Sequence, residues 1–343
     1  MGYAEAVRRA LALLLLIAAI APVTWLRMPL VRASRDYSVR FEKVEIPAKE
    51  LSRPHLGPFE LVGIWQMSSS HRGFGGFSSL APVGDGRLLS MSDRGFYIFF
   101  APPGRPMTPI QYDMVFSRLA KPKANRDIEA IAWDAESKTA WTAQENYNAV
   151  ARLHWRDGRF HLSGFCAPPV MALWGSNSGP ESMTRLADGR FVTISEGFPQ
   201  NGTDRYHEAA IFASDPVDNP EGERFFVEGI PGFKPTDIAQ LPDGRALVLF
   251  RRPVWPFPVR FAGRLAIGDP SAIAKGKTWR LREVARLSSV LPVDNFEGLA
   301  IEPREDGKVD VWLISDDNMS AFQRTLLWHL VVDPADLPGE SGR

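Results

Sequence analysis

The sequence is poor in the residues from which many catalytic and zinc-binding motifs are built. Among its 343 residues there is one cysteine, Cys166, so no disulfide can form within the chain. The six histidines are scattered, and no two stand at a spacing that would bind zinc. The 40 basic residues equal the 40 acidic ones, which gives no electrostatic reason to expect a nucleic-acid partner. These absences leave the carboxylates as the main candidates for chemistry.

Familiar catalytic motifs are also missing. There is no phosphate-binding P-loop and no His-Glu-x-x-His zinc motif. Residues 73–76 are rich in glycine, but no helical pattern follows, so they do not form a dinucleotide fingerprint. Residues 175–179 carry Asn where a nucleophile elbow requires its serine. The remaining nucleophilic alternative is a Ser–His–acid triad assembled by the fold, from Ser78, Ser79 or Ser182 with His71 or His207.

An uncharged apolar run opens the chain. Residues 10–26 are rich in leucine and alanine and have arginines on both sides, which is the pattern of an export signal. Cleavage would fall after Ala21 or Ala33, and without cleavage these 17 residues can just span a bilayer as an anchor. We therefore expect residues 1–33 to contain a hydrophobic helix that is a signal peptide or a membrane anchor. The rest of the chain is expected to be exported to the periplasm, either soluble or anchored to the inner membrane.

From about Tyr37 onward the pattern indicates strands rather than helices. Short apolar runs rich in Val, Ile, Phe and Trp alternate with turn residues, among them many of the 28 prolines and 28 glycines. Beyond the N-terminus no stretch sustains a helical stripe. The dipeptide Asp-Gly, a strong signal for a hairpin turn, occurs at residues 85–86, 157–158, 188–189, 243–244 and 306–307.

Five stretches of the chain resemble one another. Each places a polar residue near the start of an apolar run, passes through a turn, and ends a second apolar run with another polar residue. The first position recurs every 50 to 60 residues, at Ser79, Glu129, Glu181, Asp237 and Glu297. The second position is occupied by Asp93, Glu145, Glu196, Arg251 and Asp316. A repeat of this length built from strands is typical of one four-stranded propeller blade per copy.

The repeat predicts an all-β protein, a β-propeller whose blades close into a ring. Five copies give five four-stranded blades, while residues 37–46 and the long interval 251–290 leave room for a sixth. After the fifth copy only one clear strand, 325–332, remains, so the strand at 59–67 is expected to complete the last blade and close the ring. The expected divisions after residue 33 are a leader segment at 34–58, the propeller at 59–332 and a tail at 333–343.

In a propeller the first strand of each blade lines the central channel, so the repeat would gather its acidic residues near one axis. Crowded carboxylates raise one another's pKa or bind a cation, and oxygen ligands suit Ca²⁺ first and Mg²⁺ second. The expected cation ligands are Asp93, Glu129, Glu145, Glu181, Glu196 and Asp237. The expected catalytic residues are Glu297, Asp316 and Asp317, and the expected ligands of an anionic substrate are Arg94, Arg251, Arg252 and Asn318. For the first-strand acids, bonding to turns or to the backbone of a neighbouring blade is an equally good explanation.

Several of these segments resemble the bacterial phytase-like family, which is often described as having esterase-like activity. The matching pieces are residues 75–80, 92–95, 127–130, 179–182, 195–197, 235–238 and above all 294–298, 315–318 and 323–326. The resemblance covers roughly residues 59–332 and implies an exported β-propeller that acts on a phosphoester or carboxylester. Ser79 departs from the acidic pattern of the other copies. The Arg-His-Gly motif of histidine acid phosphatases is absent, so a phosphatase mechanism would depend on a metal.

Together, the residues and the resemblance predict an exported, metal-dependent hydrolase of small anionic esters. The protein is expected to be a monomer that meets the membrane only through its N-terminal segment. The alternative, from another class, is a non-catalytic propeller anchored in the envelope that binds a sugar, a peptide or a partner protein. Propellers host both kinds of function, so the fold does not decide between them.

Overall fold

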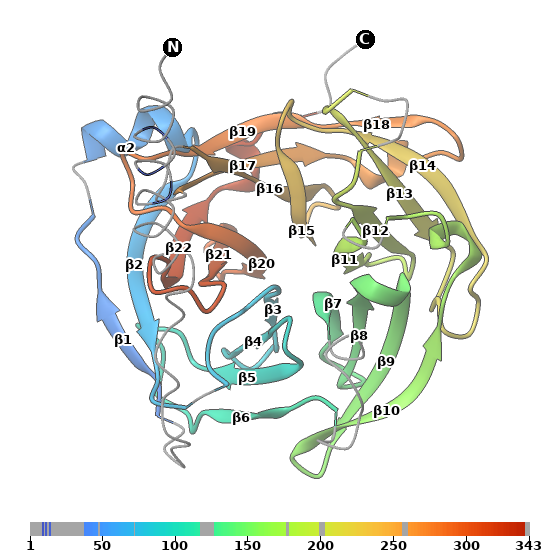
Figure 1. The fold of residues 1–343 in the computed structure, drawn as a ribbon, viewed down its shortest axis with the longest axis horizontal. Coiled ribbons are helices and arrows are strands. Elements are labelled where there is room, and N and C mark those ends of the chain that lie inside the picture. The colour runs from blue at the N-terminus through green and yellow to red at the C-terminus, as the bar shows by residue number, and fades with distance from the viewer. Residues whose placement is uncertain are drawn as a thin grey trace.

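Five β-sheets stand around a central axis in the computed structural model (Figure 1). The structure describes residues 9, 11, 14, 38–46, 49–71, 73–116, 127–175, 178–198, 203–255 and 260–339. Within these residues each sheet contains a four-stranded antiparallel blade, and two sheets carry a fifth strand at their outer edge. The prediction of an all-β propeller with five four-stranded blades is therefore confirmed.

The blades follow one another along the chain, and the strand named first in each is the innermost (Figure 1). Blade 1 consists of β3 (Ala81–Pro82), β4 (Leu88–Met91), β5 (Phe96–Phe100) and β6 (Gln111–Met114). Blade 2 consists of β7 (Ile128–Asp134), β8 (Thr139–Gln144), β9 (Ala149–Arg156) and β10 (Arg159–Cys166). Blade 3 consists of β11 (Pro180–Arg185), β12 (Phe191–Ser195), β13 (Tyr206–Phe212) and β14 (Gly222–Glu228). Blade 4 consists of β15 (Lys234–Gln240), β16 (Ala246–Val254), β17 (Arg260–Gly268) and β19 (Arg282–Leu287).

Blade 5 joins the two ends of the chain. Its inner strands β20 (Asn295–Pro303), β21 (Val309–Asp316) and β22 (Thr325–Val332) come last in the sequence. Its fourth strand is the N-terminal β2 (Glu60–Ser68), which pairs antiparallel with β22. The predicted closure of the ring is confirmed. Because β22 pairs with β21 on one side and with β2 on the other, it has no unpaired edge.

The expectation of room for a sixth blade is wrong. The early strand β1 (Arg40–Lys43) pairs with β2 as a fifth strand of blade 5. In the long interval after Arg251, strands β17 and β19 complete blade 4, while the short β18 (Thr278–Arg280) pairs in parallel with β14 of blade 3. Both segments therefore thicken existing blades, because each finds a free outer edge on which to pair.

The N-terminal hydrophobic helix predicted within residues 1–33 lies outside the described residues, apart from Arg9, Leu11 and Leu14. Among the residues that the structure does describe, no helix is long and apolar enough to cross a membrane. The short helix α2 (Lys49–Leu56) packs against β2 and β19, where Leu56 is buried in the core.

The apolar core lies between neighbouring blades. Nearly all residues of β20 and β21 are buried, since both faces of each inner strand are covered by another sheet. This explains why these strands read as continuous apolar runs rather than as alternating patterns. Between blades 1 and 2 the core is aromatic, with the rings of Tyr97, Phe99 and Phe160 in mutual contact.

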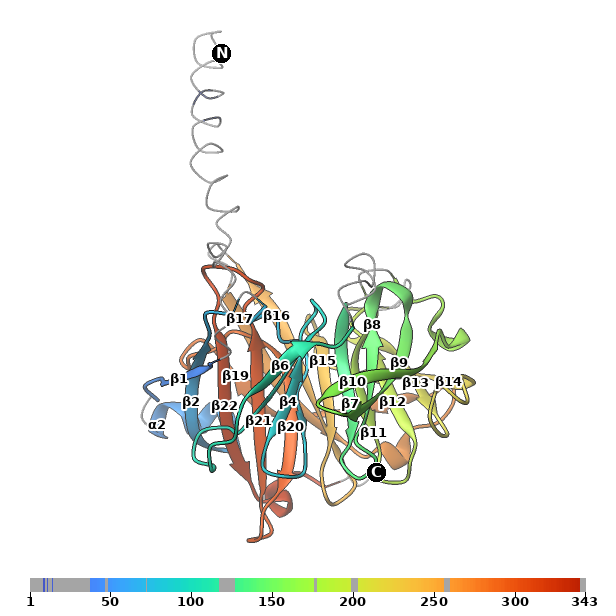
Figure 2. The ribbon, with the colours of Figure 1, turned by 90° about the horizontal axis from the view of Figure 1, so that it is seen from below.

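Inner strands begin, and second strands end, at the same end of the ring, which we call the mouth. The five Asp-Gly turns and the hairpins from first to second strands lie at the opposite end, which we call the far end. Figure 2 shows the strands from the side, running between these two ends. The topology thus places the polar ends of all five repeats at the mouth.

Candidate metal and active site

A β-bulge near the start of the inner strands sets the geometry of the centre. In blades 2 to 5 the pairing with the second strand slips by one residue, and a single inner-strand residue is left unpaired. In blade 1 the same slip falls between Phe77 and Ala81. A bulge turns its extra residue away from the regular pleat. The unpaired residues in blades 2 to 5 are Glu129, Glu181, Thr236 and Glu297.

This register corrects the sequence alignment by one residue in two blades. The counterpart of the glutamates in blade 4 is Thr236, and in blade 1 it is Ser78, in place of Asp237 and Ser79. The hydrogen bonds agree: the Ser78 hydroxyl donates to the carbonyl oxygen of Ile128 at 2.6 Å, and the Thr236 hydroxyl donates to that of Phe296 at 3.2 Å. Each acceptor directly precedes the bulge glutamate of the next blade. In these two blades the bulge residue therefore joins blades, and in the other three it carries a carboxylate.

Asp237 has a structural environment. Its carboxylate accepts hydrogen bonds from the backbone N–H of Ile238 at 2.8 Å and of Leu299 at 2.7 Å, and from that of Leu80. These donors belong to blades 4, 5 and 1. Asp237 therefore links three blades near the axis, and we leave it out of the proposed cation site.

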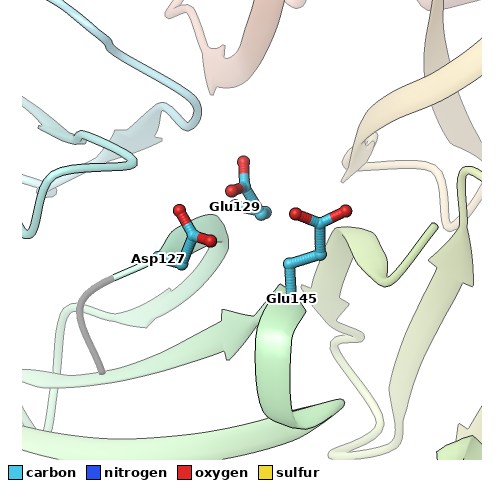
Figure 3. A group of neighbouring side chains, drawn as sticks. All are labelled: Asp127, Glu129 and Glu145. Atoms are coloured by element: carbon cyan, nitrogen blue, oxygen red, sulfur yellow. The ribbon is translucent and has the colours of Figure 1, made fainter. Parts of the chain in front are cut away.

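One group of three carboxylates in blade 2 is arranged to hold a cation. Asp127, Glu129 and Glu145 each offer an oxygen, and these oxygens lie within 4.8 Å of one another (Figure 3). Two of the three come from the start of the inner strand and one from the end of β8, so the bulge at Glu129 brings them to one space. Within the described residues, Glu129 accepts no hydrogen bond and forms no ion pair, although it is buried.

A second group shares Glu145 with the first. Glu145, Glu181 and Glu196 also present oxygens within 4.8 Å of one another. Glu196 is neutralised from blade 4, because the Lys234 ammonium donates to it at 2.9 Å and Arg251 lies at 3.9 Å. The acidic side of the centre is thus formed by blades 2 and 3, and its basic side by blade 4.

Blade 5 contributes a third cluster around Glu297. Arg251 lies 3.1 Å from the Glu297 carboxylate, and the Asn295 amide donates to the same oxygen at 2.6 Å. The Asn295 amide oxygen is buried and, within the described residues, has no hydrogen-bond partner. At the end of β21, Asp316 accepts a bond from the backbone N–H of Asn318 at 2.6 Å. Asn295 therefore supplies a further unused oxygen beside the carboxylates.

Asp317 serves the loop that covers this end of blade 5. It accepts hydrogen bonds from the backbone N–H of Gly76 at 3.1 Å and of Met319 at 2.9 Å, and from the Thr325 hydroxyl at 3.1 Å. Gly75 has φ of +104°, and a Cβ there would stand 2.7 Å from the Asp317 oxygens. This close approach requires glycine, and it leaves Asp317 as an anchor for the loop at residues 73–76.

The remaining expected site residues lie around the mouth. Asp93 is half-buried and is one of the carboxylates that raise the pKa of Glu297 and of Asp316. Arg94 is half-buried with its guanidinium over the ring of Phe96. Arg252 is exposed with its guanidinium 4.6 Å from the ring centre of Phe233, and Asn318 is exposed. The structure thus gathers Glu129, Glu145, Glu181, Glu196, Glu297, Asp316 and Arg251 at the centre and places Arg252 and Asn318 outside it.

The Ser–His–acid alternative gains no support from the fold. The Ser78 hydroxyl is used between blades. His207 is buried, its Nε2 bonds the carbonyl oxygen of Phe233 at 3.2 Å, and burial lowers its pKa to about 4. The Ser182 hydroxyl is buried without a hydrogen-bond partner among the described residues. These groups therefore do not form a nucleophile–base pair.

Burial and mutual repulsion raise the pKa values of several central carboxylates above their usual range. Burial raises the pKa of Glu129 well above its usual range, and four neighbouring carboxylates raise it further. Burial likewise raises the pKa of Glu181, against the opposing charge of Arg251. The pKa of Asp316 is raised first by burial and then by Glu297. Burial alone would lower the pKa of Arg251, but the surrounding carboxylates raise it, so this guanidinium stays charged.

Glu145 gives the centre a pH dependence in the neutral range. Burial, followed by the charges of Asp127 and Glu196, raises its pKa from 4.5 to about 7. Between these values the folded protein holds a proton that the unfolded chain has released. The cation-free protein should therefore lose stability as the pH rises from about 4.5 to 7. Cation binding needs the deprotonated form, so affinity should change in the opposite sense.

The measurement is a pair of titrations on the same protein. Thermal unfolding in EDTA should give a melting temperature that falls across this pH window, and calorimetric Ca²⁺ affinity should rise across it. In a Glu145→Gln variant, both the melting temperature and the Ca²⁺ affinity should depend less on pH across this window. A Ca²⁺ affinity that is constant from pH 5 to pH 8 would contradict the assignment of Glu145 as a ligand.

Sequence reasoning missed two residues of the centre, Asp127 and Lys234. Asp127 stands two residues before Glu129, and the alternation of side chains along a strand could have placed both on one side. Lys234 is the first residue of β15, where no acidic pattern drew attention to it. Its contact with Glu196 depends on how blades 3 and 4 pack, which the sequence does not display.

Comparison with solved structures found several chains of similar structure. The Myxococcus xanthus glutaminyl cyclase is similar in structure, with a TM-score of 0.43 and 11% identity over 80% of this chain and 97% of that chain. The Kuenenia stuttgartiensis hydrazine synthase gives a TM-score of 0.40 and 12% identity over 71% of this chain and 77% of that chain. The WD40 β-propeller domain of Doa1 gives 0.38 and 11% identity over 82% and 100%. We draw no conclusion about activity from these likenesses, and no curated protein matches the chain.

The sequence itself matches a family model. The match extends over residues 72–319, which includes all five bulges and all the carboxylates of the centre. The family is named phytase-like, and its description is the esterase-like activity of phytase. Because this match covers well over half of the chain, the protein belongs to the phytase-like family.

Proposed function

We propose that the protein is an exported, cation-dependent hydrolase of anionic esters, with its active site at the mouth of the propeller. The observation that carries this proposal is the group of Asp127, Glu129 and Glu145, whose oxygens converge within 4.8 Å without an ion pair to Glu129 or Glu145 within the described residues. Such a group is costly unless a proton or a cation compensates it. The family description, esterase-like activity of phytase, supports a hydrolytic role.

The donor set fits a hard cation. All three groups are carboxylates, and Glu181 and the unused amide oxygen of Asn295 lie in the same centre. Oxygen donors of this kind suit Ca²⁺, with Mg²⁺ as the second candidate. A cation bound there would polarise an ester oxygen and lower the pKa of a bound water.

The residues opposite the acidic side have complementary tasks. Arg251 stays charged and half-buried, and with Lys234 it forms the side of the centre that attracts an anionic group. Glu297 holds Arg251 at 3.1 Å and fixes the direction of its guanidinium. Asp316 is buried, and burial followed by the charge of Glu297 raises its pKa well above the usual range, which favours its protonated form, so we assign it as the proton donor to the leaving group.

The test is ester hydrolysis by the full chain with and without the cation. Purified protein should release phosphate or alcohol from generic phosphoesters or acyl esters in Ca²⁺ or Mg²⁺, and lose this activity in EDTA. Glu145→Gln should reduce the rate by about 100-fold or more, by analogy with the loss of other electrostatic groups from active sites. Glu136→Gln, an exposed acid of the same blade at the far end, is the matched control and should leave the rate unchanged.

A broad substrate panel without activity above the Glu145→Gln background would end the hydrolase proposal. The alternative, a non-catalytic propeller that binds a sugar, a peptide or a partner protein, would then remain. Asp237 and Asp317 favour that alternative in one respect, since backbone amides occupy their oxygens. Glu129 and Glu181 favour the enzyme, because no hydrogen bond reaches either of them within the described residues.

A further inference from the structure

Aromatic side chains are exposed around the mouth of the propeller. The loops from second to third strands open at this end, and in four blades such a loop presents an exposed ring. Of the five exposed aromatic side chains in the described residues, four stand here and the fifth, Phe165, is on the outer strand β10. Trp255 is the most exposed of them, at 69%. The four mouth residues, which we call the aromatic rim, are Tyr147, Phe198, Trp255 and Phe322.

The far end has a different character. Four of its five Asp-Gly turns are closed by short-range ion pairs between an aspartate and an arginine two residues away. These pairs leave a charged, strongly hydrated surface at that end. One apolar side chain in a far-end loop, Met107, is 97% exposed. The ring is therefore amphipathic along its axis, with aromatic rings at the mouth and ion pairs at the far end.

The chain enters the propeller at the mouth. Arg40 pairs with Ser68, and Met67 pairs with Thr325, which follows the mouth loop of blade 5. The Ser69 hydroxyl also donates to the carbonyl oxygen of Ser38 at 2.7 Å. The apolar run at residues 10–26 is joined to this point by residues 27–37 alone. Eleven residues reach at most about 35–40 Å, so an anchor formed by that run would hold the mouth near the bilayer.

We propose that the aromatic rim rests on the surface of a lipid bilayer, so that the central site receives the head group of an anionic amphiphile. Tryptophan and tyrosine favour the membrane–water interface, where their rings meet the acyl boundary and their polar atoms stay hydrated. The exposed Arg252 stands just before Trp255 and, within the described residues, has no carboxylate partner, so it is free to meet an anionic head group. The orientation follows from the rim and the tether, and the substrate class rests on the proposed hydrolase function.

The orientation can be tested without any activity. In the full chain with Cys166→Ala, Phe322→Cys and Met107→Cys are labelled separately with an environment-sensitive dye. The proteins are then reconstituted into phosphatidylcholine–phosphatidylglycerol vesicles that contain nitroxide-labelled lipid. The dye at position 322 should be quenched several-fold more than the dye at position 107. Equal quenching at both positions, or none at position 322, would overturn the proposal and leave a soluble partner for the rim.

The role of the rim itself needs a second pair of variants. With the dye at Tyr147→Cys, the double change Trp255→Ser and Phe322→Ser should reduce quenching, whereas Phe165→Ser, which changes the exposed ring on the outer strand β10, should not. Unchanged quenching in the double variant would show that the tether alone sets the orientation. It would overturn the proposed contact between the aromatic rim and the bilayer.

The substrate class is read from a ratio of rates. The double variant should reduce hydrolysis of phosphatidic acid in vesicles at least fivefold relative to that of soluble 4-nitrophenyl phosphate. Hydrolysis of soluble ester alone would overturn the amphiphile proposal while the hydrolase function stands. If neither substrate reacts, the substrate class falls with the hydrolase function, and the quenching result still decides the orientation.

Discussion

Replacing Glu129 by glutamine should abolish cation-dependent activity and, in the same protein, raise the melting temperature measured in EDTA. Glu129 is buried, and burial together with four carboxylates raises its pKa well above the usual range. Glutamine keeps the shape of the side chain but removes a charge that the cation-free centre must otherwise protonate or repel. Each kcal/mol of relieved repulsion should raise the melting temperature by about 1–2 °C in a chain of 343 residues.

The cation should stabilise the wild-type protein more than the Glu129→Gln variant. A ligand at 100 times its dissociation constant stabilises the folded state by about 2.7 kcal/mol. The wild-type protein should therefore gain several degrees on addition of Ca²⁺, and Glu129→Gln should gain little. Differential scanning fluorimetry at pH 8 gives the melting temperature of each of the two proteins in EDTA and in Ca²⁺. A variant that is less stable than the wild type in EDTA, or that responds equally to Ca²⁺, would contradict a cation site at Glu129.

The sign of the change in stability after substitution distinguishes a functional carboxylate from a structural one. A carboxylate kept for binding destabilises the empty protein, whereas one that accepts backbone hydrogen bonds stabilises it. Glu129 and Asp237 are both buried at the start of an inner strand, so burial does not separate them. What separates them is the set of donors around each oxygen.

The repeat was sufficient to predict the five blades and the closure of the ring. Its spacing reflects one blade per copy, and the single strand left after the fifth copy requires a partner from the N-terminus. The allowance for a sixth blade failed because β1 and β18 lie in the two segments, 37–46 and 251–290, that left room for one, while their pairing with an existing outer edge is a tertiary feature. Strand-forming sequence does not specify which edge a strand joins.

The sequence predicted that acidic residues would line the centre, but it did not correctly predict which residue of each inner strand occupies the bulge. The alignment placed Asp237 with the glutamates because it matched residue type, but the bulge selects Thr236. A bulge shifts side chains by one residue without any sequence signal of its own, and a one-residue shift exchanges the two faces of a strand. The pairing of Lys234 with Glu196 could not be read from either segment alone, because it forms between blades.

Asp237→Ala should destabilise the protein more than any change to the cation ligands. The substitution removes the acceptor for the N–H groups of Ile238, Leu299 and Leu80, and a buried amide without an acceptor costs about 1–3 kcal/mol. Burial raises the pKa of this carboxyl, which offsets part of its benefit. We expect a net loss of roughly 2–5 kcal/mol in the free energy of unfolding, measured by urea denaturation in EDTA.

The matched control is Ser182→Ala, the residue that follows the bulge in blade 3 as Asp237 does in blade 4. Its hydroxyl is buried without a partner among the described residues, so its removal should be neutral or slightly stabilising. Because Asp237 contacts blades 1, 4 and 5, its loss should also loosen the closed ring, which hydrogen exchange at Leu80 and Leu299 would report. If Asp237→Ala unfolds at the same urea concentration as Ser182→Ala, the three-blade link contributes nothing. Asp237 would then return to the candidates for the cation site.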